Sequence, residues 1–127
     1  GHARALERTT TFNMPDHLKA QEEVVRRFRA DLLSTPPEAM LGVATQTLDG
    51  RVPVHGLRHP PQADTCGWFI WAGDPSAADD FFQPMHAAHL EELAPQVIPY
   101  LGLGPGWRFL LTPDYEDVWF DANLLRL

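Results

Sequence analysis

The sequence predicts an α+β fold, with an antiparallel sheet of about five strands, an N-terminal helix and short helices packed mainly on one face. Three observations lead to this class. The 127 residues, 44% of them hydrophobic, suffice for one domain with a core. The expected elements follow one another as helix, strands, short helices and strands, without regular alternation. No internal repeat or long linker divides the chain, so we expect a single domain over residues 1–127.

The first expected element is a helix that starts within 13–16, with Asn13 or Met14 at the cap, and runs to about Leu33. A Met-Pro-Asp sequence suits its first turn, and apolar residues then recur at helical spacing. Residues 1–12 have no clear hydrophobic period, and a flexible arm and a short edge strand both stay open for them. The outer face of the helix is charged, and we expect it to be solvated. Its side chains are Lys19, Glu22, Glu23, Arg26, Arg27 and Arg29, with Glu22–Arg26 and Glu23–Arg27 at the favourable spacing of four.

Two strands are expected next, at 40–47 and 51–57, because both segments are rich in residues of high strand propensity. The Leu-Asp-Gly sequence at 48–50 is a hairpin signal, so we expect the two strands to be neighbours. Pro53 has no N–H group to donate, which places the second arm at a sheet edge or a bulge.

The clearest central strand is 66–73, a continuous apolar run of Cys-Gly-Trp-Phe-Ile-Trp-Ala-Gly. Residues 76–84 are then expected to form a loop whose two aromatic residues, Phe81 and Phe82, return to the core. A short helix is expected at 86–93. Another helical turn or two follows to Leu101, with a proline at its first position.

The densest apolar material lies in 99–121, where we expect two paired strands, 107–111 and 115–120, joined by a Thr-Pro-Asp turn. Both faces of the second strand carry aromatic residues, so one face must be covered and the other is available to a partner. Asp121 is expected to cap a last turn at 122–125. The expected core consists of Trp68, Ile70, Phe109, Leu111 and Val118, with Phe28 and Leu32 of the first helix against them.

Charge is distributed unevenly along the chain, whose net charge is -7. Residues 1–63 carry eight Lys or Arg against seven acids, whereas residues 64–127 carry two against ten. The acidic half would repel phosphates, which argues against nucleic acid as a direct partner and favours a basic protein. The acids that we expect at this partner surface are Asp74, Asp79, Asp80, Glu91, Glu92, Asp114, Glu116 and Asp117.

The residue types that carry chemistry form weak patterns here. Two histidines three apart, His86 and His89, can place two imidazoles near one metal, but no third ligand follows at a recognisable interval. The single cysteine, Cys66, lies on an apparently buried strand, where a packing role is favoured over a nucleophilic one. The glycine cluster at 102–106 follows a helix and precedes a strand, the reverse of a phosphate-binding loop.

We therefore expect no catalytic residue, no metal and no cofactor. The alternative is a small metal- or ligand-binding enzyme with a pocket of histidines and carboxylates, built on His55, His59, His86 and His89. No apolar run approaches the roughly 20 residues needed to span a bilayer, and there is no basic-then-apolar leader. Together with the lone cysteine, this predicts a cytoplasmic protein without a membrane partner.

Five blocks of the sequence together resemble a bacterial family. The blocks are GLRHPP at 56–61, CGWFIWAGD at 66–74, DDFFQPMHAAHL at 79–90, PYLGLGPGWRFL at 99–110 and YEDVWFD at 115–121. The family is that of the thirty-third-class-like immunity proteins of polymorphic toxin systems. The resemblance covers roughly residues 40–125 and leaves the N-terminal helix outside. It implies a cytoplasmic, non-catalytic protein that binds and neutralises a cognate toxin, and it supplies no site residues. The acidic second half suits a basic toxin such as a nuclease.

Overall fold

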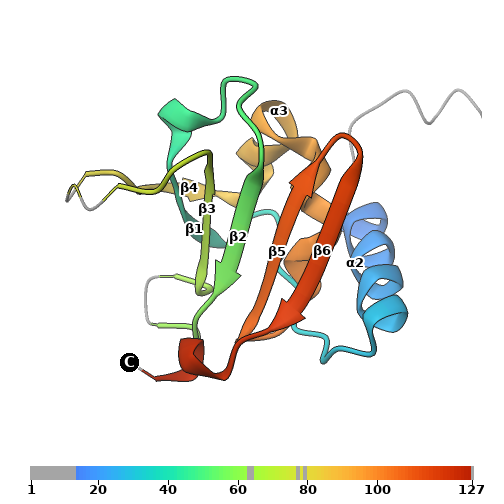
Figure 1. Cartoon of the computed structure of the whole chain (residues 1–127). Coiled ribbons are helices and arrows are strands. Elements are labelled where there is room, and N and C mark those ends of the chain that lie inside the picture. The colour runs from blue at the N-terminus through green and yellow to red at the C-terminus, as the bar shows by residue number, and fades with distance from the viewer. Residues whose placement is uncertain (1–13, 63–64, 77, 79, 127) are drawn as a thin grey trace, which may run out of the picture.

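A computed structural model describes residues 14–62, 65–76, 78 and 80–126, with side chains from Leu18 onward. Among these residues one sheet of six strands has the order β4-β1-β3-β2-β5-β6 (Figure 1). The β1 and β3 strands run parallel, and the other neighbouring pairs are antiparallel. The strands are β1 (Met40–Val43), β2 (Val54–Arg58), β3 (Trp68–Ala72), β4 (Gln83–His86), β5 (Trp107–Thr112) and β6 (Tyr115–Phe120).

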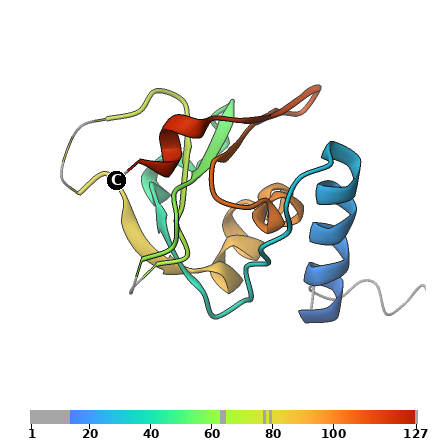
Figure 2. The same cartoon turned by 90° about the horizontal axis from the view of Figure 1, so that it is seen from below.

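The helical elements are an N-terminal helix and several short turns. They are α2 (Met14–Phe28), η1 (Thr45–Thr47), η2 (Ala87–His89), α3 (Leu90–Leu93), η3 (Pro95–Gly102) and η4 (Ala122–Leu125), where η marks 3-10 helix. Figure 2 shows α2 and η3 on the same side of the sheet. This arrangement confirms the α+β class, with a mostly antiparallel sheet covered by an N-terminal helix and short helices.

The main core lies between this helical layer and the sheet. Four of the expected core residues, Trp68, Ile70, Phe109 and Leu111, are buried, while Phe28 and Val118 pack against them half-buried. Gly56 lies under the Phe109 ring, and a Cβ there would come within 2.3 Å of the ring carbons, so the ring needs a glycine beneath it. The expectation for Leu32 is wrong, because this side chain is 45% exposed.

Leu32 is exposed because α2 ends earlier than the hydrophobic period predicts, at Phe28 instead of about Leu33. Arg29 adopts a left-handed conformation with φ 56°, and the N–H of Ala30 donates to the carbonyl of Val25 at 2.9 Å. These are the features of a Schellman motif, in which glycine usually occupies the left-handed position. An arginine there gives no stop signal, so the sequence did not reveal the helix end.

The predicted hairpin over 40–57 is wrong, because β3 lies between β1 and β2. After β1 the chain leaves the sheet as η1, where the hydroxyl of Thr47 donates to the Ala44 carbonyl and accepts from the N–H of Ala72. The two hydrogen bonds of Thr47 hold η1 against Ala72, the last residue of β3. The edge expectation for 51–57 is also wrong, since β2 pairs with both β3 and β5. Pro53 precedes the strand, so its missing N–H removes no ladder bond.

β4 is a strand that the sequence pattern did not predict. Its residues Gln-Pro-Met-His were assigned to a loop and to the start of a helix, yet they pair antiparallel with β1 from Met40↔His86 to Val43↔Gln83. Proline is tolerated because β4 is an edge strand among the described residues. Before β4, Phe81 is buried as expected, but it packs with Trp71 and Ala44 on the sheet face opposite the main core.

The end of the chain follows the prediction closely. β5 and β6 form an antiparallel hairpin, and the register sets Val118 opposite Phe109 on the core face and Asp117 opposite Leu110 on the other face. The carboxylate of Asp121 accepts from the N–H of Asn123 at 3.0 Å and so caps η4. The start of η3 at Pro95 is confirmed as well.

Arg58 is a buried cation at the end of β2, only 1% exposed. Its guanidinium donates to the carbonyls of Cys66 (3.0 Å), Leu33 (2.5 Å) and Leu103 (2.8 Å). Burial lowers the pKa of Arg58 to about 10, so it stays charged at neutral pH. We call the set of Arg58, Trp68 and the carbonyls of Leu33, Cys66, Leu101 and Leu103 the Arg58 cluster; in it the Trp68 indole donates to Leu101 at 3.1 Å.

Candidate functional site

A groove of about 690 Å³ lies at the end of the sheet where the 48–53 segment, α3 and the β5–β6 turn meet, the upper end in Figure 1. Residues from all three segments line it. We call it the end groove and define it by Leu48, Val52, Leu93, Tyr100, Tyr115 and Glu116, with Arg51 and Asp114 at its border.

The end groove exposes large apolar side chains. Val52 is 53% exposed, Leu93 41% and Tyr115 57%, and the three come from different segments of the chain. Isolated exposed apolar residues are ordinary on protein surfaces, but their convergence in a concave site is typical of a surface that binds a partner or ligand.

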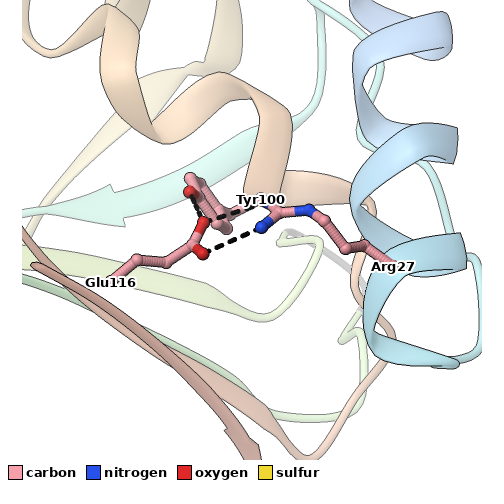
Figure 3. Close-up of polar contacts among 3 residues, drawn as sticks. All are labelled: Arg27, Tyr100 and Glu116. Carbon is pink, nitrogen blue, oxygen red and sulfur yellow. Dashed lines mark hydrogen bonds and ion pairs between the residues drawn. The ribbon is translucent and has the colours of Figure 1, made fainter.

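Glu116 occupies one wall of the groove and is held by two other residues, Arg27 of α2 and Tyr100 of η3, as Figure 3 shows. The Arg27 guanidinium donates to the two carboxylate oxygens at 2.9 and 3.0 Å, and the Tyr100 hydroxyl donates to one of them. We call these three residues the clasp. It links β6, η3 and the N-terminal helix.

The clasp fixes the charge state of its members. The hydrogen bond from Arg27 holds the pKa of Glu116 below its ordinary value, so the carboxylate is ionised at neutral pH. Burial, followed by the bond to Glu116, raises the pKa of Tyr100 to about 12, so its phenol stays protonated. The expected pairing of Glu23 with Arg27 is replaced by this contact, because a bidentate carboxylate from the sheet is available to the arginine.

Three of the eight expected partner-binding acids lie at or beside the end groove. Asp114 and Glu116 line it, and Glu92 is exposed on α3 next to the lining residue Leu93. Asp74 lines a neighbouring hollow of about 520 Å³, which shares Arg51 with the end groove. The structure thus gathers part of the predicted set at one end of the sheet.

The other acids are placed elsewhere. Asp117 lies on the sheet face opposite the clasp, and Asp80 lies in the segment before β4, where its carbonyl accepts from Gln83 at 2.7 Å. Glu91 is half-buried on α3, and Asp79 lies outside the described residues. The described acids of this set therefore do not converge on one surface.

The cation in the lining of the end groove is already paired. Arg51 contacts Asp49 at 3.3 Å, and both side chains are more than half exposed. Within the described part of the chain, neither Asp114 nor Glu92 has an ion-pair partner. The border of the end groove consequently presents unpaired negative charge beside exposed apolar side chains.

The four histidines of the alternative site are spread over the molecule. His55 stacks on Trp71 with ring centroids 4.8 Å apart, and burial lowers its pKa. His59 bonds through Nδ1 with the carbonyl of Leu124 at 3.0 Å. His86 and His89 lie together at the β4 edge, separated from β2 by β3 and β1. No group of three or more His, Cys, Asp or Glu among the described residues is arranged to hold a metal ion.

Several residues of the end groove and of the clasp were not predicted from the sequence. Arg27 looked like an ordinary charged residue of a helix face, since its partner lies 89 positions away in the chain. Val52 and Leu93 look like unremarkable apolar residues in a loop and a short helix. Tyr100 had a usable signal, because it stands in the block PYLGLGPGWRFL beside a proline that interrupts the helix.

A comparison with protein families places these features in context. Residues 20–121 match the Imm33-like domain, which is most of the chain. The chain belongs to the Imm33-like family. The match to this immunity-protein family covers all six strands. It also covers α2 from residue 20 onward, whereas the resemblance over 40–125 left that helix outside.

The helical part of the clasp is therefore inside the Imm33-like domain. No curated protein and no solved structure was found to match the chain. In the described part of this Imm33-like chain, no helix combines the length and the apolar character needed to cross a bilayer.

Proposed function

We propose that this Imm33-like protein binds the toxin domain of a polymorphic toxin system in the cytoplasm and neutralises it by direct contact, without catalysis of its own. Membership of an immunity-protein family is the observation that carries this proposal. The scattered histidines support it, since they do not form the convergent set of acid, base and nucleophile that a catalytic pocket needs.

The proposed contact surface is acidic and contains aromatic residues. We propose partner-binding roles for the eight acids named from the sequence, with those at the end groove foremost, and a basic toxin, such as a nuclease, as the partner. Apolar anchors supply most of the binding energy of a protein interface, while peripheral charges supply association rate and selectivity. Exposed Val52, Leu93 and Tyr115 beside Asp114 and Glu92 offer both elements.

The alternative of a small metal- or ligand-binding enzyme finds no favouring observation. Of the two hollows described above, the end groove is lined by no histidine and the neighbouring one by His55 alone. A protein inhibitor needs no such pocket. It needs a surface with exposed anchors, which the end groove has.

The test is co-expression with the toxin domain encoded beside this gene. Cells that produce both proteins are expected to grow, cells that produce the toxin alone to arrest, and the two purified proteins to form a stable complex. The matched control is an unrelated acidic protein of similar size and net charge in place of this one. If growth arrest persists with both proteins present and no complex forms, the proposed function is wrong.

A further inference from the structure

The end groove combines three properties of a docking surface. Its lining includes the exposed side chains of Val52, Leu93 and Tyr115. Its border carries Asp114 and the nearby Glu92, neither of which has an ion-pair partner among the described residues. The clasp holds Glu116, which lines one wall of the groove. The carboxylate is therefore already fixed in position before a partner binds.

The opposite face of the sheet is the main competitor as a docking surface, since it is rich in aromatic residues. There the rings contact each other: Phe82 lies edge-on to Phe69, Trp71 and Phe81, with centroids 5.2, 6.0 and 4.8 Å apart. Trp71 and Phe81 are buried by these contacts. Phe81 and Phe82 thus cover the part of this face that carries Phe69 and Trp71.

The chemistry of the groove defines what fits it. An apolar or aromatic side chain can bury against Val52 and Leu93, and a guanidinium or ammonium group on a neighbouring residue can reach Asp114 at the border. Arginine and lysine suit this combination, because their aliphatic stems pack on apolar surface while their charged heads stay near solvent. An acidic segment would instead meet the unpaired carboxylates.

We propose that the end groove is the docking site for a segment of the toxin domain that carries an arginine or lysine next to an apolar anchor residue. The inference rests on the proposed function and assigns it a place on the molecule. The apolar anchor occupies the space between Val52 and Leu93, and the cation pairs with Asp114. The clasp keeps β6 and α2 in position while the partner binds.

The experiment measures binding of the toxin domain encoded beside this gene to purified variants. Leu93→Arg places a bulky cation in the groove and is expected to weaken binding about 100-fold, since it removes an anchor and repels a basic segment. The matched control is Leu125→Arg, which adds the same charge at an exposed leucine of η4 and is expected to change the Kd less than about twofold. Val52→Arg tests the groove independently from the 48–53 segment, with the same expected result as Leu93→Arg.

A second pair of variants tests the border charge. Asp114→Asn is expected to lower the association rate about threefold to tenfold at low salt and to reduce its dependence on salt. Glu38→Gln also removes one negative charge, at an exposed position outside the groove and outside the eight proposed acids, and should alter the rate less than about twofold. All variants are first shown to be folded by circular dichroism and denaturant unfolding.

The outcomes separate the two proposals. If the wild-type protein neither binds nor neutralises the toxin, the proposed function and the docking site both fail. If the wild type binds and Leu93→Arg and Val52→Arg bind as tightly, the docking site is wrong and the function stands. Equal loss in Leu125→Arg would also overturn it, because the effect would then come from added charge and not from the groove.

Discussion

Arg58 and Arg27 lie in regions at opposite ends of β2, and they differ in solvent exposure and in the kind of acceptor that they bond. Arg58, at the last residue of the strand, is 1% exposed and bonds main-chain carbonyls. Arg27 belongs to the clasp beside the end groove, where β2 starts; its side chain is 54% exposed and it bonds a carboxylate. The buried arginine holds chain segments together, whereas the exposed one positions another side chain.

The difference follows from the cost of removing a charge from water. A buried guanidinium needs its donors satisfied, and the carbonyls around Arg58 supply the acceptors. Cation and carbonyls therefore depend on one another. Around Arg27, water can replace a lost partner, so its ion pair contributes little to stability and acts mainly on geometry. The first region should be sensitive to substitution and the second tolerant.

The largest effect is expected from Arg58→Ala, which should lower the free energy of unfolding by about 5 kcal/mol. It removes the donor from the buried carbonyl of Leu103 and from the part-buried carbonyls of Leu33 and Cys66, and it opens a cavity. Urea unfolding measures the change, and Arg26→Ala, at an exposed arginine of α2, serves as control. A loss below about 1 kcal/mol would show that water reaches the Arg58 cluster.

Phe109→Ala removes only apolar packing next to the Arg58 cluster, without taking a hydrogen-bond donor from it. Phe109 is 1% exposed and its ring lies 5.5 Å from that of Trp68, so we expect a loss of about 4 kcal/mol. The matched control is Phe120→Ala on β6, where the ring is 47% exposed, with an expected loss below about 1.5 kcal/mol. If Phe109→Ala and Phe120→Ala lower the free energy of unfolding equally, the core does not centre on Phe109.

Glu116→Gln tests the clasp, with an expected loss of about 1 kcal/mol at neutral pH once solvent screening of this exposed pair is allowed for. Because folding lowers the pKa of Glu116, its contribution is complete above the ordinary carboxyl value of 4.5 and disappears as pH falls through the lowered pKa. The difference between wild type and variant, measured by unfolding from pH 7 to pH 3, should therefore shrink with acid. A difference that stays constant would mean that the carboxylate charge is not what stabilises the clasp.

The smallest effect is expected from Arg51→Ala. Its pair with Asp49 is more than half exposed on both sides, so stability should change by less than about 0.5 kcal/mol. Binding is the more sensitive measurement, since removing this cation makes the border of the end groove more negative and should speed association with a basic toxin. Slower association would indicate that Arg51 itself contacts the partner.

The sequence by itself determined the elements whose signals are local. Alternation of residues set the two faces of β6, Pro95 set the start of η3, and Asp121 set the cap of η4. In each case the residues that carry the signal lie within a few positions of the structure that they specify. The family could also be read from the chain, because its blocks are long and rich in tryptophan.

Tertiary structure decided the rest. β4 is a strand because it pairs with β1, 40 to 46 residues earlier, and β1 and β2 are separate because β3 comes between them. The end groove takes its lining from three distant segments, and the carboxylate of Glu116 is held by Arg27 from 89 positions away. A short stretch of sequence does not specify such contacts. They stabilise the protein only after folding has brought the distant segments together.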